Sequence, residues 1–144
     1  MLTYRDVLKL YPETRGIKEE HISFGSITLN SSSTQLKGLY FGTAADLDLG
    51  AAIANGAIAA IWPKEISLPA YTPNHFPVFF AHDSIEAMVV VVRKYTNKIT
   101  LEKREDLTNM ILSKQDLQNE KIYNEIHMLL DGMQPETKKG RKQK

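Results

Sequence analysis

The sequence predicts an α/β protein with a small mixed, partly parallel sheet, flanking helices and a C-terminal helical extension. The first observation behind this prediction is that residues 26–62 contain a strand, a loop, a strand, a helix and a strand in close succession. Elements linked this tightly are typical of a parallel α/β layer. The second observation is that residues 76–95 add an apolar strand followed by apolar residues at helical spacing.

A short helix is predicted near the N-terminus. Its apolar positions are Leu2, Val7, Leu8 and Leu10. Thr3 is the expected N-cap, with Asp6 three residues later in an approximate capping-box position. The helix should end near Tyr11-Pro12, and the charged segment 15–21 then reads as a connector.

The next two strands are expected on either side of a polar loop. Residues 26–30 alternate polar and apolar side chains, as a half-buried strand does. Residues 31–38 contain a serine cluster and a glycine, which mark a loop. Residues 39–43 are β-prone and include two adjacent aromatic residues.

A helix and a third strand follow. Asp46 or Asp48 can cap the helix by accepting hydrogen bonds from its first amides. Asn55-Gly56 is a natural end, because glycine tolerates the left-handed conformation that terminates helices. Residues 57–62 then form a short apolar strand that stops at a proline.

The segment 63–74 contains three prolines and reads as a surface loop, and 76–81 is a candidate buried strand. A helix should follow, capped by Asp83 with Glu86 three residues later. Its apolar positions at helical spacing are Ile85, Met88, Val89, Val92 and Tyr95. The branched run 89–92 favours a strand instead, but spacing and capping favour the helix.

The C-terminal part has an amphipathic pattern from residue 107 to Gly132. One long helix or two shorter helices fit this pattern, because Ser113 with Asp116 could start a second helix. The apolar face could pack on its own domain, or residues 107–130 could bind a second copy or a protein partner. We therefore divide the chain into an α/β domain (1–99), an amphipathic helical extension (100–133) and a basic, disordered tail (134–144).

Composition limits the class of protein. The 144 residues suit one domain, with 42% hydrophobic and 24% charged residues. Because 18 basic residues nearly balance 17 acidic ones, no strong field attracts nucleic acid or a membrane. The absence of cysteine excludes disulfides and thiol catalysis. With no signal-peptide core and no apolar run of roughly 20 residues, we expect a cytoplasmic protein.

Three motifs occur in order along the central segment: Asn-Ser-Ser at 30–32, Lys-Gly-Leu-Tyr-Phe-Gly-Thr at 37–43, and Ala-Ile-Ala-Asn-Gly-Ala-Ile-Ala-Ala-Ile at 52–61. They resemble the N-terminal domain of the Mur ligases, in the branch that adds the third residue or the terminal dipeptide to the peptidoglycan precursor. The resemblance covers about residues 20–98. It implies a Mur ligase N-terminal-like fold that binds UDP-N-acetylmuramoyl-peptide or a related uridine nucleotide.

The resemblance also implies a first binding loop. Asn30, Ser31 and Ser32 lie where the family has Asp-Ser-Arg, so the Ser31 hydroxyl and nearby amides would meet uracil or ribose. Ser32 replaces an arginine, a planar cation suited to gripping anionic or carbonyl groups. Lys37, at the family's proline position, would partly compensate. The alternative is that residues 30–34 form only a hydrogen-bonded turn.

The second binding loop implied by the resemblance spans residues 43–48, with Thr43 and Asp46 as its candidate ligand-binding residues. It is shorter than the family pattern and lacks the family's Asp-Gly element. Asp46 and Asp48 would repel a diphosphate.

No catalytic residues, metal site or cofactor are predicted. A Mur ligase needs a glycine-rich, lysine-containing phosphate loop, yet residues 98–106 contain no glycine. The four histidines are scattered, without ligand spacing. We therefore expect a non-catalytic, stand-alone module with a regulatory role. The alternatives are an interaction or structural module that acts through its C-terminal helix, and an enzyme with an unrelated site, for which convergent catalytic residues are lacking.

Overall fold

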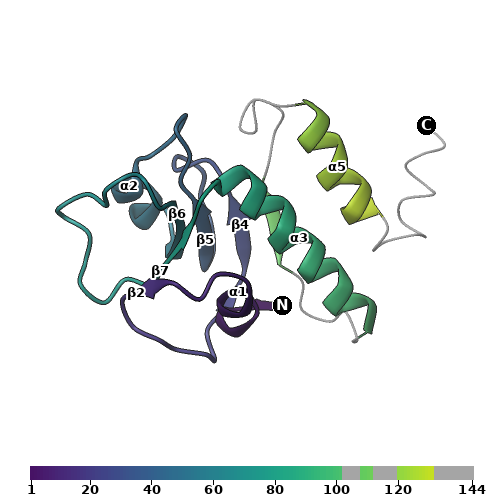
Figure 1. The fold of residues 1–144 in the computed structure, drawn as a ribbon, viewed down its shortest axis with the longest axis horizontal. Helices are drawn as coiled ribbons and strands as arrows, with labels where there is room; N and C mark the ends of the chain where they lie inside the picture. The colour runs from purple at the N-terminus through teal and green to yellow at the C-terminus, as the bar shows by residue number, and fades with distance from the viewer. Residues whose placement is uncertain (102–107, 112–119, 132–144) are drawn as a thin grey trace.

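The computed structural model describes residues 1–101, 108–111 and 120–131. Its centre is a six-stranded sheet in the order β2-β7-β6-β5-β4-β8 (Figure 1). The strands are β2 (Thr14–Arg15), β4 (Ser26–Thr28), β5 (Gly38–Phe41), β6 (Ala57–Pro63), β7 (Val78–Ala81) and β8 (Asn109–Ile111). β2 pairs antiparallel with β7, and all other neighbours are parallel. The chain is therefore an α/β protein with a mixed, mostly parallel sheet, as predicted.

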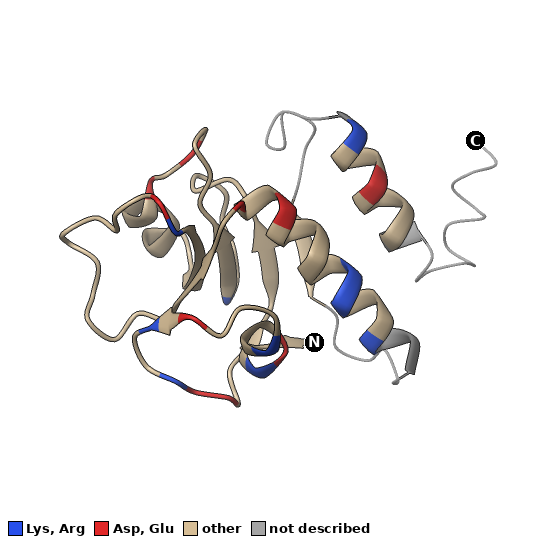
Figure 2. Ribbon diagram, in the orientation of Figure 1, with Lys and Arg blue, Asp and Glu red and all other residues tan. Residues whose placement is uncertain are grey.

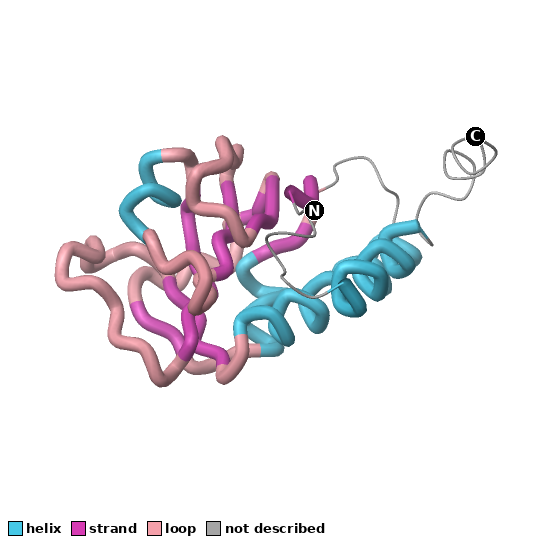
Figure 3. The backbone as a smooth tube through the Cα atoms, turned by 90° about the horizontal axis from the view of Figure 1, so that it is seen from above, coloured by secondary structure: helices cyan, strands magenta, loops and turns pink. Residues whose placement is uncertain are grey.

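Helices cover both faces of the sheet. α2 (Leu49–Ala54) lies on one face, and α1 (Tyr4–Leu10) and α3 (Ser84–Leu101) lie on the other (Figure 3). The strands serve both layers, because side chains alternate across a sheet. On β5, Leu39 and Phe41 belong to the core formed with α1 and α3, whereas Tyr40 belongs to the core formed with α2.

The N-terminal helix begins at the predicted capping box. The Thr3 hydroxyl accepts a hydrogen bond from the Asp6 amide at 3.2 Å, and the Asp6 carboxylate accepts one from the Thr3 amide at 3.0 Å. Lys98 of α3 donates to the same carboxylate and to the Met1 carbonyl, both at 2.8 Å. The N-terminus is thus attached to the long helix.

A second, two-stranded sheet joins β1 (Leu2–Thr3) to β3 (Ser23–Phe24) in antiparallel pairing. The sequence did not predict these strands. Buried Thr108 attaches them to the main sheet, since its hydroxyl accepts from the Leu2 amide at 2.9 Å and donates to the Phe24 carbonyl at 2.6 Å. The Tyr95 hydroxyl accepts from the Thr108 amide at 2.7 Å.

The central β5–α2–β6 unit follows the predicted boundaries closely. Of the two candidate caps, Asp48 is the N-cap, and its carboxylate accepts from the Ala51 amide at 3.0 Å. The helix ends at Asn55, and Gly56 has a φ of +118°, in the range that favours glycine. α3 confirms the helix over 89–92, and Asp83 accepts from the Ile85 and Glu86 amides.

The prediction of a helix over 107–112 is wrong where the structure describes it. Asn109–Ile111 is β8, which pairs in parallel with β4 and places Met110 beside Ile27. Pairing satisfies the backbone groups that an open edge of β4 would expose, and this outweighs the helical periodicity. The second helix is confirmed as α5 (Glu120–Asp131), but its predicted start at 113–116 and the tail 134–144 lie outside the described residues.

α5 packs along α3 (Figure 1). Ile126 is fully buried in the core shared with α3, and Glu125 pairs with Arg93 at 2.8 Å. No helix in the described parts of the chain is long and apolar enough to cross a membrane.

Candidate functional site

The parallel strands β4, β5, β6 and β7 all end at the same edge of the sheet, which we call the carboxyl edge. The loops that follow these strands converge there, together with the N-terminus of α3. Open α/β sheets bind ligands in the crevice at this edge. The carboxyl edge is therefore where a ligand site is expected from the fold.

Five of the six predicted ligand-binding residues lie at the carboxyl edge. Asn30, Ser31 and Ser32 follow β4, and Thr43 and Asp46 follow β5. Contacts within this group connect the two loops, because the Ser31 amide donates to the Asp46 carboxylate at 2.9 Å.

Lys37 lies at the opposite edge of the sheet. It immediately precedes β5, and its carbonyl accepts from the Gly25 amide, just before β4, at 3.0 Å. Its φ of +49° marks a tight turn. The structure thus separates Lys37 from the other five candidates, and its role toward a ligand stays a prediction.

Asp46 is the centre of the polar contacts between the two loops. Besides the Ser31 amide, its carboxylate accepts from the Tyr40 hydroxyl at 2.9 Å and the Asp48 amide at 3.4 Å. Burial by itself raises the pKa of Asp46, but hydrogen bonds from the Ser31 amide and hydroxyl and from Tyr40 outweigh it, so the pKa is lowered overall. Burial, with the adjacent Asp46 carboxylate, raises the pKa of Tyr40 and keeps it a donor.

The loop after β4 forms a hydrogen-bonded turn, and this geometry does not test whether the loop also binds a ligand. The Asn30 side-chain oxygen accepts from the Ser32 amide at 2.8 Å, and its carbonyl accepts from the Ser33 amide at 3.2 Å. Ser31 is only 4% exposed, and its carbonyl accepts from the Asn55 side chain at 2.9 Å. Ser31 thus contacts Asp46, two residues before the N-cap of α2, and Asn55, the C-cap of α2, while Ser32 is exposed. The ligand-binding role of Asn30, Ser31 and Ser32 stays a prediction.

The loop after β5 is a tight turn. Thr43 and Asp46 exchange two backbone hydrogen bonds, at 3.0 and 2.9 Å. Between them, Ala44 and Ala45 are exposed, and their amides donate to no group in the described part of the chain. Sequence reasoning missed these amides because alanine side chains give no signal of backbone donors.

A pocket of about 350 Å³ adjoins this turn. Thr43, Pro63 and Ser84 are among its lining residues. Ser84 is the first residue of α3, and its buried hydroxyl has no partner in the described parts of the structure.

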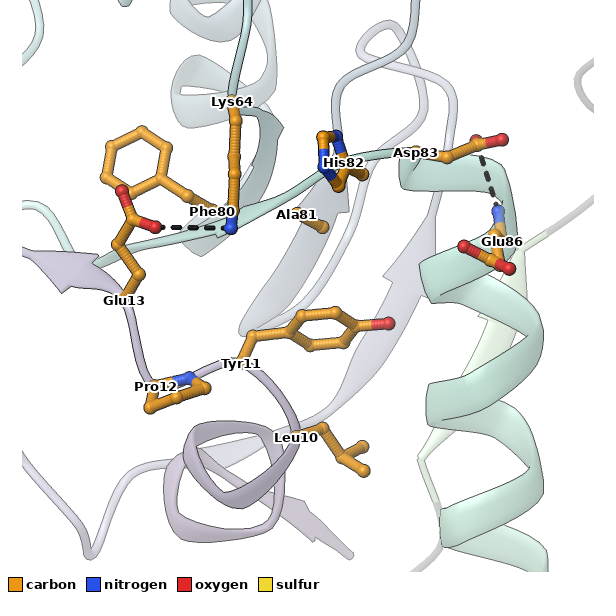
Figure 4. A pocket seen from close by; sticks show the side chains of 10 residues that line it. All are labelled: Leu10, Tyr11, Pro12, Glu13, Lys64, Phe80, Ala81, His82, Asp83 and Glu86. Atoms are coloured by element: carbon orange, nitrogen blue, oxygen red, sulfur yellow. Dashed lines mark hydrogen bonds and ion pairs between the residues drawn. The ribbon is translucent and has the colours of Figure 1, made fainter.

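A second pocket, of about 380 Å³, shares His82 and Asp83 with the first (Figure 4). Tyr11, Lys64 and Glu86 reach it from the end of α1, the end of β6 and the first turn of α3 (Figure 4). Sequence reasoning missed this group, because three ordinary surface residues from separate segments form no motif.

The carboxyl edge is acidic. Loops and the first turn of α3 place acidic side chains along it, while a single lysine, Lys64, stands among them in the described residues (Figure 2). The acidic residues are Glu13, Asp46, Asp48, Glu65, Asp83 and Glu86. Lys64 pairs with Glu13 at 3.3 Å, and Nδ1 of His82 lies 2.9 Å from the Glu65 carboxylate. A ligand at this edge would therefore meet a negative field.

No group of three or more metal-ligating side chains comes together in the described residues. His82 contacts Glu65, while His75 lies before β7, at the far end of that strand.

No protein-family model matches this chain, and no curated protein matches it. The Mur ligase resemblance therefore rests on the three central motifs and stays a prediction. The proposed partner surface over 107–130 also stays a prediction, although the apolar face of α5 contacts α3 in this structure.

Proposed function

We propose that this chain is a non-catalytic binding module of the Mur ligase N-terminal type, which holds a uridine-nucleotide precursor of peptidoglycan at its carboxyl edge in a regulatory role. The observation that supports the proposal is the meeting of five candidate residues at the edge where α/β sheets bind ligands. The three motifs that resemble the family supply the class of ligand.

The uridine part of the ligand would occupy the loops after β4 and β5. Ser32 is exposed, and the amides of Ala44 and Ala45 offer hydrogen-bond donors for carbonyl or phosphate oxygens. The diphosphate would lie in an unfavourable field, because Asp48 is exposed beside this turn. Uridine recognition should therefore be stronger, relative to diphosphate recognition, than the family pattern implies.

The test is a calorimetric and thermal-shift titration with UDP-N-acetylmuramoyl-peptide, UDP and uridine, with ATP as the control nucleotide. A ligand at about 100 times its dissociation constant adds roughly 2.7 kcal/mol to the free energy of unfolding. Stabilisation by the three uridine ligands and not by ATP is the expected result. Absence of any shift at millimolar uridine ligand would rule out the proposed nucleotide site.

Asp48→Asn sharpens this test. Asparagine caps a helix as well as aspartate does, so stability should be retained while one negative charge is removed. UDP should then bind about two- to fivefold more tightly and uridine equally well, given the usual size of exposed charge interactions. Glu20→Gln removes one exposed negative charge from the segment before β3, away from the turn 43–46, and is the matched control. Equal effects of the two variants on UDP would place the diphosphate away from the turn 43–46.

A further inference from the structure

The pocket between α1 and the start of α3 is amphiphilic. Leu10, Ala81 and the ring of Tyr11 give it an apolar surface, while the Phe80 ring lies beyond Lys64 and Glu13 (Figure 4). The Tyr11 ring lies between Lys64 on one side and Glu86 on the other, and its hydroxyl points toward Glu86 (Figure 4). A ligand seated here would contact an apolar surface flanked by opposite charges.

The two charged sides differ in how fully they are neutralised. Lys64 is paired with Glu13 at 3.3 Å, and both side chains are substantially exposed. On the other side, Asp83 uses one carboxylate oxygen to cap α3, at 2.9 Å from the Ile85 amide and 3.2 Å from the Glu86 amide. Within the described residues, no hydrogen bond or ion pair involves the Glu86 carboxylate.

The negative charges of Glu86 and Asp83 affect the Tyr11 side chain that lines the pocket. Burial raises the pKa of Tyr11, and the carboxylates of Glu86 and Asp83 raise it further. His82 stands at the rim, with its Nδ1 turned to Glu65. Among the described residues that line the pocket, the only basic side chains are Lys64 and His82, so neither lysine nor arginine stands beside the two carboxylates near α3.

We propose that this pocket binds the amino-terminal residue of a peptide whose first side chain is apolar. The terminal ammonium group would lie beside Glu86 and Asp83, and the side chain would pack on the Tyr11 ring. The first peptide carbonyl would accept a hydrogen bond from Lys64, whose ammonium group has donors beyond the one directed at Glu13. A peptide suits the pocket better than a free amino acid, because a free carboxylate beside Lys64 would also meet Glu13. The proposal does not depend on uridine-nucleotide binding.

The experiment is an NMR titration of the isotope-labelled full chain at pH 7 with L-leucinamide and with N-acetyl-L-leucinamide. The two probes share a side chain and a carbonyl, but acetylation removes the amine, whose pKa is about 8. L-leucinamide should shift the amide signals of Tyr11, Lys64 and Glu86, with a dissociation constant in the millimolar range. The acetylated probe should bind about fivefold more weakly, which corresponds to the upper value for one exposed ion pair.

Two variants locate the ammonium group. Glu86→Gln should weaken L-leucinamide about two- to fivefold, and Glu86→Lys should weaken it further. Glu20→Lys is the matched control, because Glu20 is exposed, pairs with Arg5 and does not line the pocket. Equal binding of the two probes, unchanged binding to Glu86→Lys, or no shifts at about 20 mM L-leucinamide would each overturn the proposal. If Glu20→Lys weakens L-leucinamide binding as much as Glu86→Lys does, the binding reflects only attraction by the net charge of the protein, and the proposed pocket is overturned.

Discussion

Asp46 is the residue at which the two loops of the candidate site meet. Its carboxylate accepts hydrogen bonds from the Ser31 amide, in the loop after β4, and from the Tyr40 hydroxyl, on β5. Hydrogen bonds to a charged acceptor contribute about 1.5–3 kcal/mol each. The charge of Asp46 thus helps to hold the loop after β4 in place. This is a structural role for a residue that the sequence suggested as ligand-binding.

Asp46→Asn should lower the free energy of unfolding by about 1–3 kcal/mol at pH 7, because the Ser31 and Tyr40 donors lose a charged acceptor. The folded-state pKa of Asp46 is lowered, so its contribution is present above its unfolded-state pKa of about 3.9 and is lost as the pH falls through the folded-state value. Urea denaturation at pH 7 and pH 3 should therefore show a smaller difference between wild type and variant at pH 3. An equal difference at both pH values would contradict the role of the charge.

Thr108→Val tests a second single residue. Valine has nearly the same shape, but the Leu2 amide and the Phe24 carbonyl would lose their shared partner in a buried place. We expect a loss of about 1–3 kcal/mol in the free energy of unfolding, measured by urea denaturation. Thr72→Val is the control, since the buried Thr72 hydroxyl bonds only within a local loop, to Pro69 at 2.7 Å. A loss below about 0.5 kcal/mol from Thr108→Val would show that the N-terminal attachment contributes little.

At the scale of elements, α5 shows that an amphipathic pattern predicts a helix without identifying the surface that its apolar face packs against. The spacing of apolar residues predicted the helix, but not whether α5 would cover its own domain or another chain. In the structure Ile126 is fully buried against α3, whereas Met128 is 74% exposed. Substituting each of the two residues therefore measures how much the contact between α5 and α3 contributes to stability.

Ile126→Ala should lower the free energy of unfolding by about 2–5 kcal/mol, because it removes buried methyl and methylene groups and leaves a cavity. Met128→Ala changes the same helix at an exposed position and should stay within about 0.5 kcal/mol. Thermal unfolding of the two variants, at several protein concentrations, checks this. If Ile126→Ala is neutral in the monomer but abolishes a dimer, the apolar face of α5 serves a second copy instead of α3.

At the scale of the whole molecule, the sequence predicted the parts that depend on neighbouring residues. The β5–α2–β6 unit was predictable because its caps, its glycine and its apolar alternation are local signals. β1, β2, β3 and β8 were not, since strands of two or three residues form through pairing with distant partners. The position of Lys37 was not predictable for a similar reason: its match to the family's proline position does not show that the chain crosses to the other edge of the sheet between Ser32 and Lys37.

The pocket between α1 and α3 was also not predictable, because its lining residues come from segments far apart in the sequence. Tyr11, Lys64 and Glu86 meet only after β6 and β7 have paired and α1 has packed beside them. None of the three is unusual for a surface, so no motif could have identified them. By contrast, the turn at 30–34 was predictable from the hydrogen-bonding habits of asparagine and serine.

The order of the strands has a consequence for how the chain is made. β4, β5, β6 and β7 are neighbours in the sheet in the same order in which they are synthesised. The outer neighbour of β4, however, is β8, which comes from residues 109–111. Until that segment has been synthesised, the nascent chain presents the backbone of β4 as an open edge, and Leu2 and Phe24 lack Thr108. Open strand edges recruit strands from other chains. The fold is therefore completed late, and the interval before residue 111 emerges is when the chain is most exposed to misassembly or to capture by a chaperone.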